Sequence, residues 1–371
     1  MTKISRTTDM TQGSEMRHII MFSLPLLAGN LLQQTYNIVD TMVVGRYLGD
    51  DALAAVGATG SITYLFYTLC IGLSVGAGII VAQYFGAGKK KALRSAVFNS
   101  ALVTAIFGIV ISLLSVPAAR PILELLKVPD KLIGDSVAYM QIACGGTIAV
   151  AAYNWINAIM RALGDSKTPL IFLGAASLLN ALLDLLFVVV FKFGIAGAAW
   201  ATVLTQALSA ISCIVYCFAV SGEIKLTADD LHADKDMMSR CVKTGVPIAI
   251  QNGLISVSMV ALQRVTNGFG ETVMAAYTVS MRIEQFVQQP FSSLNAAVST
   301  FTGQNIGAGK EKRAQKGLAC AIKISVIFSA VVLVLFTLFG GAITSWFVKG
   351  KTVISISAKA LIITSLFYWS L

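Results

Sequence analysis

Charged residues are scarce in this chain of 371 residues, because Asp, Glu, Lys and Arg together make up only 12% of it. A soluble domain normally carries about 25% charged residues, so the composition excludes an ordinary soluble globular domain. Hydrophobic residues make up 56%, and the mean hydropathy is +0.77. The apolar residues form stretches of about 20 or more, long enough for a helix to cross a bilayer. Outer-membrane barrels show short alternating segments instead. The sequence therefore predicts an all-α membrane protein with many spans.

Histidine is almost absent, and cysteine lacks companions of metal-binding type. The two histidines, His18 and His232, lie in polar segments outside the apolar runs. Cys213 and Cys217 are four residues apart, but no histidine or acid accompanies them at metal-ligand spacing. We therefore expect the six cysteines to be buried apolar residues rather than zinc ligands or disulfides. Without a constellation of His, Ser, Cys and acid, we expect no enzyme and no cofactor.

A complete phosphate-binding loop is missing as well. GAGK occurs at 86–89 and 307–310, but neither copy has the full GxxxxGK[ST] pattern or follows a strand, which excludes nucleotide binding. The formal net charge of +10 would suggest a nucleic-acid partner in a soluble protein. In a membrane protein it indicates basic cytoplasmic loops, so we expect no nucleic-acid partner.

Ten apolar spans follow one another, and the last runs into the C-terminus. The predicted spans are 19–45, 52–82, 94–116, 134–160, 169–191, 195–220, 243–266, 272–303, 317–339 and 352–371. With the N-terminus inside, 18 Lys and Arg residues lie on the cytoplasmic side and 9 on the other, a bias that sets this orientation in the cytoplasmic (inner) membrane. Residues 1–18 are polar, show no cleavable signal peptide and have the composition of a cytoplasmic tail.

The chain repeats itself at an offset of 221 residues. AQYFGAGKKKALRSAV at 82–97 matches GQNIGAGKEKRAQKGL at 303–318, and Pro25 corresponds to Pro247. Six spans separate equivalent points, and an even number makes the two repeats parallel, related by an axis along the membrane normal.

The repeat predicts two lobes of six helices each. The first lobe covers 19–220, a cytoplasmic linker covers 221–242, and the second lobe covers 243–371. The second lobe contains only four spans, so we expect it to be incomplete and the chain to be truncated at its C-terminus.

One carboxylate lies within the apolar run SLLNALLDLLFVVVF at 177–191, where Asn180 precedes Asp184 by one helical turn. An Asp at a helix centre opposes insertion by about 2.5–3.5 kcal/mol. The 15 Leu, Ile, Val and Phe residues of 170–191 favour insertion by roughly 5–9 kcal/mol. The span therefore inserts despite Asp184, which explains why the acid is permitted but not why it is present.

Other spans place polar side chains at a similar depth. The first span has a polar stripe at 3–4 spacing, made of Gln33, Tyr36, Asn37 and Asp40. The fourth span adds Tyr139, Asn154 and Asn157. Thr202 lies in the outer half of the sixth span, level with Asp184. Such oxygen atoms suit a small hard cation, and two neighbouring carboxylates, which cannot both ionise cheaply, suit a proton equally well. The alternative is that these groups only form hydrogen bonds between helices.

The second lobe has a different polar content. Its first span, within 241–265, contains no acid, whereas its second contains Arg282 and Glu284, which are two apart and cannot pair along one helix. Glu284 either faces a cavity, where it would attract a cationic compound, or forms a structural ion pair between helices. Pro25 and Pro247 remove a backbone hydrogen bond within their spans, which permits either a movable hinge or a static kink.

Several sequence words occur in an order and spacing that resembles one transporter family. They are NIVDTMVVGRYLG at 37–49, AQYFGAGKKKALRSA at 82–96, RALGDSKTP at 161–169, AAYTVSMRIEQF at 275–286 and GQNIGAGKEKRA at 303–314. Together with the parallel repeat, they resemble the multidrug and toxic compound extrusion (MATE) family over essentially the whole chain. The resemblance implies an antiporter that expels small organic, often cationic, compounds in exchange for sodium ions or protons by alternating access.

The resemblance also implies roles for individual residues. In the family, the equivalents of Asp40, Asn180, Asp184 and Thr202 form the cation site of the first lobe. The other polar residues named above, Gln33, Tyr36, Asn37, Tyr139, Asn154, Asn157 and Glu284, become candidates for the substrate cavity, with Pro25 and Pro247 as hinges. One branch of the family carries acids in the second lobe, and this chain departs from it.

We expect the protein to be a monomer. The alternative function is that of a lipid-linked precursor flippase of a related fold.

Overall fold

The computed structural model describes residues 7–220, 224–227 and 230–370, and this part of the chain is almost entirely helical. Two short elements are irregular, a π-helical turn η1 (Leu185–Val190) and a 3-10 turn η4 (Tyr368–Ser370). The α-helices are α1 (Glu15–Leu48), α2 (Asp50–Gly86), α3 (Lys90–Leu125), α4 (Asp130–Gly145), α5 (Thr147–Ala162), α6 (Lys167–Asp184), α7 (Gly194–Val220), α8 (Lys235–Asn267), α9 (Glu271–Gly307), α10 (Glu311–Ser345) and α11 (Lys351–Ser365).

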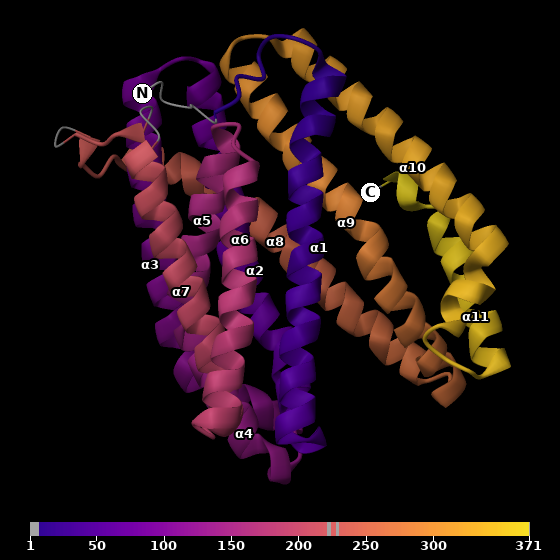
Figure 1. The fold of residues 1–371 in the computed structure, drawn as a ribbon. Helices are drawn as coiled ribbons and strands as arrows, with labels where there is room; N and C mark the ends of the chain where they lie inside the picture. The colour runs from indigo at the N-terminus through magenta and orange to yellow at the C-terminus, as the bar shows by residue number, and fades with distance from the viewer. Residues whose placement is uncertain (1–6, 221–223, 228–229, 371) are drawn as a thin grey trace.

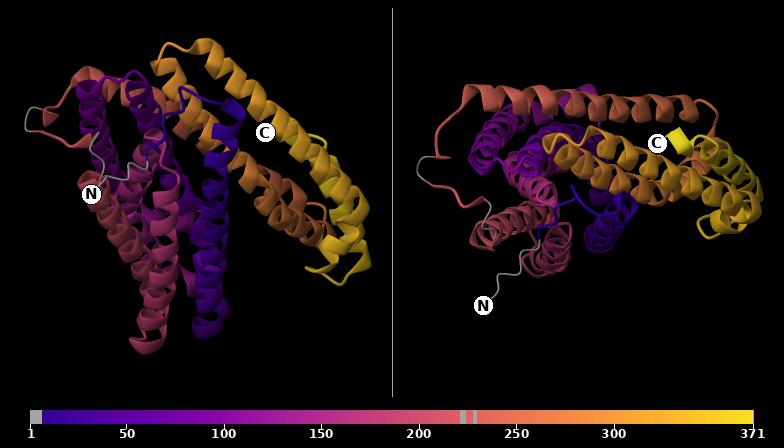
Figure 2. Two further views of the ribbon diagram at one scale, coloured as in Figure 1. Left: turned by 45° about the horizontal axis from the view of Figure 1, so that its top comes forward. Right: turned by 90° about the horizontal axis from the view of Figure 1, so that it is seen from above.

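The helices form two groups, which we name the first half (α1–α7) and the second half (α8–α11). Figure 1 shows the first half as an upright bundle, while α9, α10 and α11 lean away from it. The halves contact each other mainly through α2 against α8 and through α1 and α2 against α9. Seen from above in Figure 2, α8 runs along one edge of the molecule, beside both groups. A solute that moves between the two halves would therefore pass α1, α2, α8 and α9.

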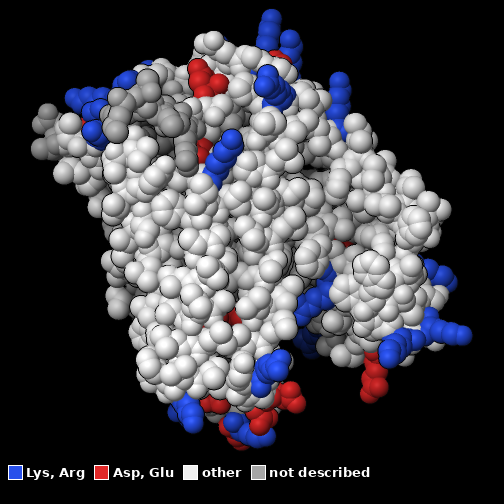
Figure 3. Space-filling model, in the orientation of Figure 1, with Lys and Arg blue, Asp and Glu red and all other residues white. Residues whose placement is uncertain are grey.

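Several helices have the length and hydropathy of membrane spans. In the described part of the chain, six helices meet both criteria, and a seventh span results if α4 and α5 are counted as one. Figure 3 shows charged side chains gathered mainly at the two ends of the molecule, with a broad band of uncharged surface between them. The protein is thus a multi-pass membrane protein, whereas the count of ten spans stays a prediction.

Three predicted spans differ from the observed helices. The span 134–160 is wrong as a single helix, because the chain bends by 42° between α4 and α5. At the bend, a Cβ on Gly146 would collide with the side chain of Val203 on α7, so the close approach of α7 requires glycine there. The span 169–191 changes from α- to π-helix after Asp184, and the span 352–371 leaves the α-helix at Ser365.

The ends of α2 and α9 meet in a reciprocal contact. A Cβ on Gly86 would collide with the backbone carbonyl of Gln304, and a Cβ on Gly307 with that of Gln83. Both equivalences, 86 with 307 and 83 with 304, have the repeat offset of 221. Only glycine permits two backbones to approach so closely. A two-fold relation between the halves would produce this arrangement.

The segment before α1 docks onto the second half. The Met10 side chain is buried, its N–H donates to Gln304 Oε1 at 2.9 Å, and its carbonyl accepts from Arg313 at 3.2 Å. Arg313 also pairs with Glu15 at 3.1 Å. Residues 1–6 of the expected tail 1–18 lie outside the described residues, Met10 and Thr11 are buried, and α1 begins at Glu15, four residues before the predicted start; the cytoplasmic location of the tail stays a prediction.

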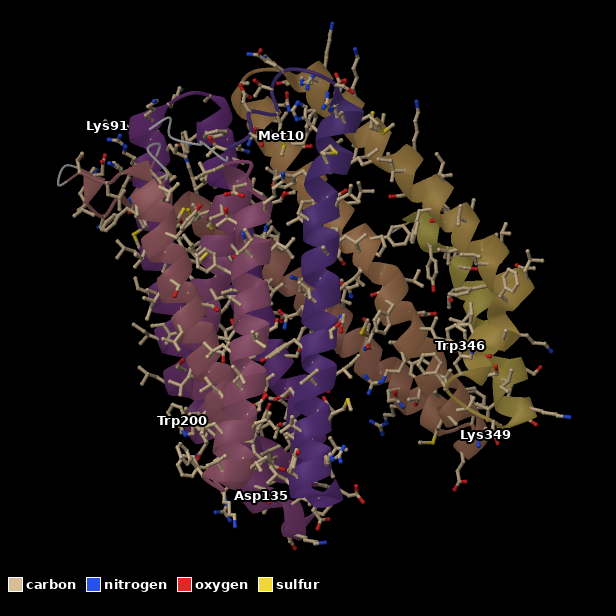
Figure 4. The ribbon with its side chains drawn as sticks, viewed as in Figure 1. Met10, Lys91, Asp135, Trp200, Trp346 and Lys349 are labelled. Carbon is tan, nitrogen blue, oxygen red and sulfur yellow. The ribbon has the colours of Figure 1, made fainter. Side chains whose placement is uncertain are left out.

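The segment before α8 docks onto the first half in the corresponding way. The Asp234 N–H donates to Asn99 Oδ1 on α3 at 2.8 Å, while the Asp234 carboxylate caps α8 by accepting from two backbone N–H groups. Asp230 lies 3.7 Å from Arg94. Hydrogen bonds from Thr227 lower the pKa of Asp230, and the charge of Arg94 adds to this effect. Because of this cap, α8 begins at Lys235, eight residues before the predicted start. Met10 and Lys91 mark this end of the molecule in Figure 4.

Candidate functional site

The deepest acid of the first half lies at the end of α6. Asp184 is fully buried and Asn180, one turn earlier, is 1% exposed. Both carboxylate oxygens of Asp184 and both amide atoms of Asn180 lack a hydrogen-bond partner among the described residues. Asp184 is also the last α-helical residue before the π-helical turn η1. Buried polar atoms without partners are rare in proteins, and π-helical turns are frequent at functional sites.

The carboxylate of Asp40 on α1 meets that of Asp184. The two side chains are close enough to share a hydrogen bond when one of them carries a proton. Helix α1 packs closely on α6 because Gly29 is buried, and a Cβ there would already touch Leu173 at 3.5 Å. Asp40 is half-buried, and its Oδ1 has no partner among the described residues. Two acids that are 144 positions apart in the sequence thus form one pair.

Hydroxyl groups lie around this pair. The Tyr36 hydroxyl, one turn before Asp40, lies near Thr202 on α7, within reach of a hydrogen bond. Tyr36 and Tyr139 are both close enough to the two carboxylates to feel their charge. Of the four residues predicted for the cation site, the structure brings Asp40 and Asp184 together, with Asn180 one turn away. Thr202 joins the group through Tyr36.

The other cavity candidates in the first half are less closely connected. Gln33 donates to Asn37 at 3.5 Å, so these two interact along α1, and Asn37 is exposed. Asn154 donates to the Val150 carbonyl of its own helix at 2.8 Å. Asn157 is buried on α5 and its Oδ1 has no partner among the described residues.

Glu284 has a different environment in the second half. It is half-buried on α9, and its carboxylate lies near the hydroxyls of Thr364 and Tyr368, within reach of a hydrogen bond. These two hydroxyls lie 3.4 Å apart. No ion pair involves Glu284 within the described residues, and Arg282 is exposed. No ion pair is therefore seen at Glu284 among the described residues, and its place in a substrate cavity stays a prediction.

Both prolines lie inside long helices. Pro25 is within α1 and Pro247 is within α8, and each helix continues past its proline. Asn30, just beyond Pro25, donates to Ser293 on α9 at 3.0 Å and so links α1 to the second half. The positions suit hinges, and that role stays a prediction.

Some buried polar residues were missed at the sequence level. Thr205 and Gln206 on α7 have buried side-chain oxygens without partners in the described part of the chain. The position of Thr205, three residues after Thr202, was a signal that could have revealed it. Arg161, one of the 18 Lys and Arg residues assigned to the cytoplasmic side, lines a partly open cavity between the halves.

The chemistry of the acid pair is that of oxygen donors. Among the described residues there is no cluster of three or more His, Cys, Asp and Glu that could hold a metal ion. Carboxylate, amide and hydroxyl oxygens prefer hard cations, and a pair of neighbouring carboxylates also takes up a proton readily. The arrangement can therefore bind a cation reversibly.

The family model MatE matches residues 25–186 and 247–371. The probable multidrug resistance protein YpnP of Bacillus subtilis is 31% identical over 307 residues, 82% of this chain and 68% of that protein. YoeA of the same organism, also a probable multidrug resistance protein, is 31% identical over 365 residues, 96% of this chain and 79% of that protein. A solved outward-facing structure of a multidrug resistance MATE family transporter of the MOP superfamily has a TM-score of 0.90 at 24% identity, over 98% of this chain and 82% of that one.

Proposed function

Because this chain belongs to the MatE family, whose members are transporters and not enzymes, we propose that it is a cation-coupled antiporter. It expels small organic, often cationic, drugs or toxic compounds across the cytoplasmic membrane in exchange for sodium ions or protons. The names of the relatives support the class of substrate. The basic residues on the side of the N-terminus support an N-terminus in the cytoplasm, and we propose that one chain suffices for transport.

The partnerless pair Asp40 and Asp184 is the observation that carries this proposal. Two like charges about 4 Å apart repel each other by about 4 kcal/mol at an effective dielectric constant of about 20. A sodium ion or proton between the carboxylates removes this repulsion and gives their oxygens a partner. The two carboxylates therefore form a binding site for one cation. Asn180 is a further ligand, and Thr202 positions Tyr36 beside the pair.

Neutralisation of the pair provides the coupling. Asp40 belongs to the same helix as Pro25 and Asn30, and Asn30 bonds to Ser293 of the second half. When a cation draws Asp40 and Asp184 together, α1 shifts relative to α9, and the bend permitted by Pro25 absorbs the change. The predicted lobes, 19–220 and 243–371, then rock about the site, as in transporters built from repeats.

Transport by the purified protein in liposomes tests the proposal. Vesicles containing a fluorescent cationic dye are given a sodium gradient, a proton gradient or neither, and dye movement is recorded. We expect dye transport against its gradient with one of the two cations. Transport of a lipid-linked pyrophosphate without dye transport would favour the flippase, and no response to either cation gradient would contradict the antiporter.

A further inference from the structure

A partly open cavity of about 330 Å³ lies between the halves, near the end of the molecule where α2 and α9 meet. The first half contributes small and apolar residues from α2 and α5, such as Gly78 and Ala158. The second half contributes hydrogen-bonding side chains of α9, which are Ser292, Asn295, Ser299 and Thr300. One charged residue also lines the cavity, Arg161 in the last turn of α5.

The guanidinium of Arg161 lacks compensation from the protein. No described residue forms a hydrogen bond or an ion pair with its side chain, and no Asp or Glu lies among the residues that line the cavity. Its position at the C-terminal end of α5 is favourable by about 0.3–1 kcal/mol. Arg161 is half-buried, so its guanidinium loses part of its hydration, and an acceptor bound in the cavity would replace the lost contacts.

The shape and donors of the cavity suit an anion. A guanidinium presents N–H groups in a planar fork that matches a carboxylate or a phosphate in a bidentate geometry. Ser299 and Thr300 can donate their hydroxyl protons, and Asn295 its amide protons, to the same group. These donors come from α9, whereas Arg161 comes from α5. An anion bound there would contact both halves.

We propose that this cavity is a subsite for the carboxylate or phosphate group of a transported solute, held by Arg161 and the α9 donors. The inference rests on the proposed function and extends its substrate class from cationic compounds to zwitterionic and anionic ones. Since the two sets of donors separate when the halves move apart, the anionic group is released as the cavity opens. The acid pair at Asp40 and Asp184 binds the coupling cation. The cation and the anionic group of the solute therefore bind at separate sites.

Equilibrium binding to the purified protein in detergent tests the subsite without requiring transport. The probes are rhodamine B and its ethyl ester, which share one cationic ring system and differ in a free carboxylate. We expect Arg161→Gln to weaken binding of rhodamine B by roughly tenfold or more, because a charge-assisted pair is lost. Binding of the ester should change by less than about twofold, and Arg161→Lys should fall between wild type and Arg161→Gln for rhodamine B.

Matched controls separate this test from the proposed function. Arg120→Gln removes an exposed arginine that pairs with Glu124 at 2.9 Å outside the cavity, and it should affect neither dye. Competition by acetate or phosphate against rhodamine B on the wild-type protein keeps the test valid if Arg161→Gln does not fold. Equal loss of both dyes in Arg161→Gln, or no competition by either anion, would overturn the subsite. Ester binding without a subsequent cation-driven efflux would instead contradict the proposed function.

Discussion

Each half of the molecule contains an acidic centre, fully buried at Asp184 and half-buried at Glu284, and the two centres differ in the groups around their oxygens. In the first half, the oxygens of Asp184 and Oδ1 of Asp40 lack protein partners within the described residues. In the second half, the carboxylate of Glu284 lies near two hydroxyl groups, those of Thr364 and Tyr368, which can donate to it. A carboxylate with hydroxyl donors is already stabilised, whereas one without donors needs an external partner. We propose that unsatisfied lone pairs, and not burial of an acid as such, distinguish the candidate cation site at Asp40 and Asp184 from the contact at Glu284.

Replacement of either acid of the pair should have the largest effect. Asp184→Asn and Asp40→Asn keep the size of the side chain but remove the charge that attracts the cation. We expect each variant to lose cation-driven dye efflux in liposomes by at least about tenfold, since several kcal/mol of electrostatic coupling disappear. Unchanged elution in gel filtration would show that the variants fold. Full efflux by both variants would show that the pair is not the coupling site.

Replacement of Asn180 should separate cation binding from stability. Neither amide atom of Asn180 has a partner among the described residues, so the amide contributes little to folding. Asn180→Leu has a similar volume and replaces a buried unsatisfied group by an apolar one, a change that is neutral or stabilising. We expect an equal or higher melting temperature together with a roughly tenfold higher cation concentration for half-maximal efflux. A lower melting temperature with unchanged cation dependence would assign Asn180 to helix packing.

The sequence was sufficient to predict the acid pair but not the geometry around it. Asp184 and Asp40 each interrupt an apolar span, and a carboxylate in a span is conspicuous in any sequence. Arg161 was not recognised, because an arginine near a helix end has the same local sequence whether its side chain turns toward water or into a cavity. That direction depends on α9, which is far away in the chain.

The errors in the helices have the same origin in contacts between distant segments. The bend at Gly146 depends on Val203 of α7, and the packing of Met10 depends on Gln304 and Arg313. A glycine or a polar N-terminal segment is compatible with many structures when it is considered alone. The repeat, in contrast, compares two parts of one sequence, and it correctly anticipated that the turns at 86–89 and 307–310 are equivalent.

The segments before α1 and before α8 offer a second contrast between the halves. Substitutions there should affect stability less than the substitutions above affect transport. Arg313 holds the segment before α1 by bonds to the carbonyls of Met10 and Gln12 and to Glu15. The segment before α8 depends on Asn99 instead. We expect Arg313→Gln to destabilise docking at 9–14 by about 2 kcal/mol, because hydrogen bonds to a charged group are lost. Hydrogen exchange followed by mass spectrometry should show faster exchange at 9–14, while 230–234 serves as the internal control. If the variant and the wild-type protein exchanged equally fast at 9–14, Arg313 would not hold that segment.

The smallest effect is expected for Glu284→Gln, the matched counterpart of Asp184→Asn. Both changes convert a carboxylate, fully buried at 184 and half-buried at 284, into an amide of the same size. At position 284 the amide oxygen still accepts from the hydroxyls of Thr364 and Tyr368, so the contact between α9 and the α11 region survives. We expect dye efflux within about twofold of wild type and a loss of stability no larger than about 1 kcal/mol, from the new amide N–H groups.

Removal of the donors should turn this satisfied acid into an unsatisfied one. The double variant Thr364→Val with Tyr368→Phe leaves Glu284 without the two hydroxyls, as Asp184 is without donors in the first half. We expect this variant to lower the melting temperature more than Glu284→Gln does, because a buried carboxylate then has no partner. If Glu284→Gln instead abolished efflux as Asp184→Asn does, a carboxylate with donors would be as essential as one without them. Hydrogen-bond satisfaction would then no longer separate the two centres, and the coupling site would have to include both halves.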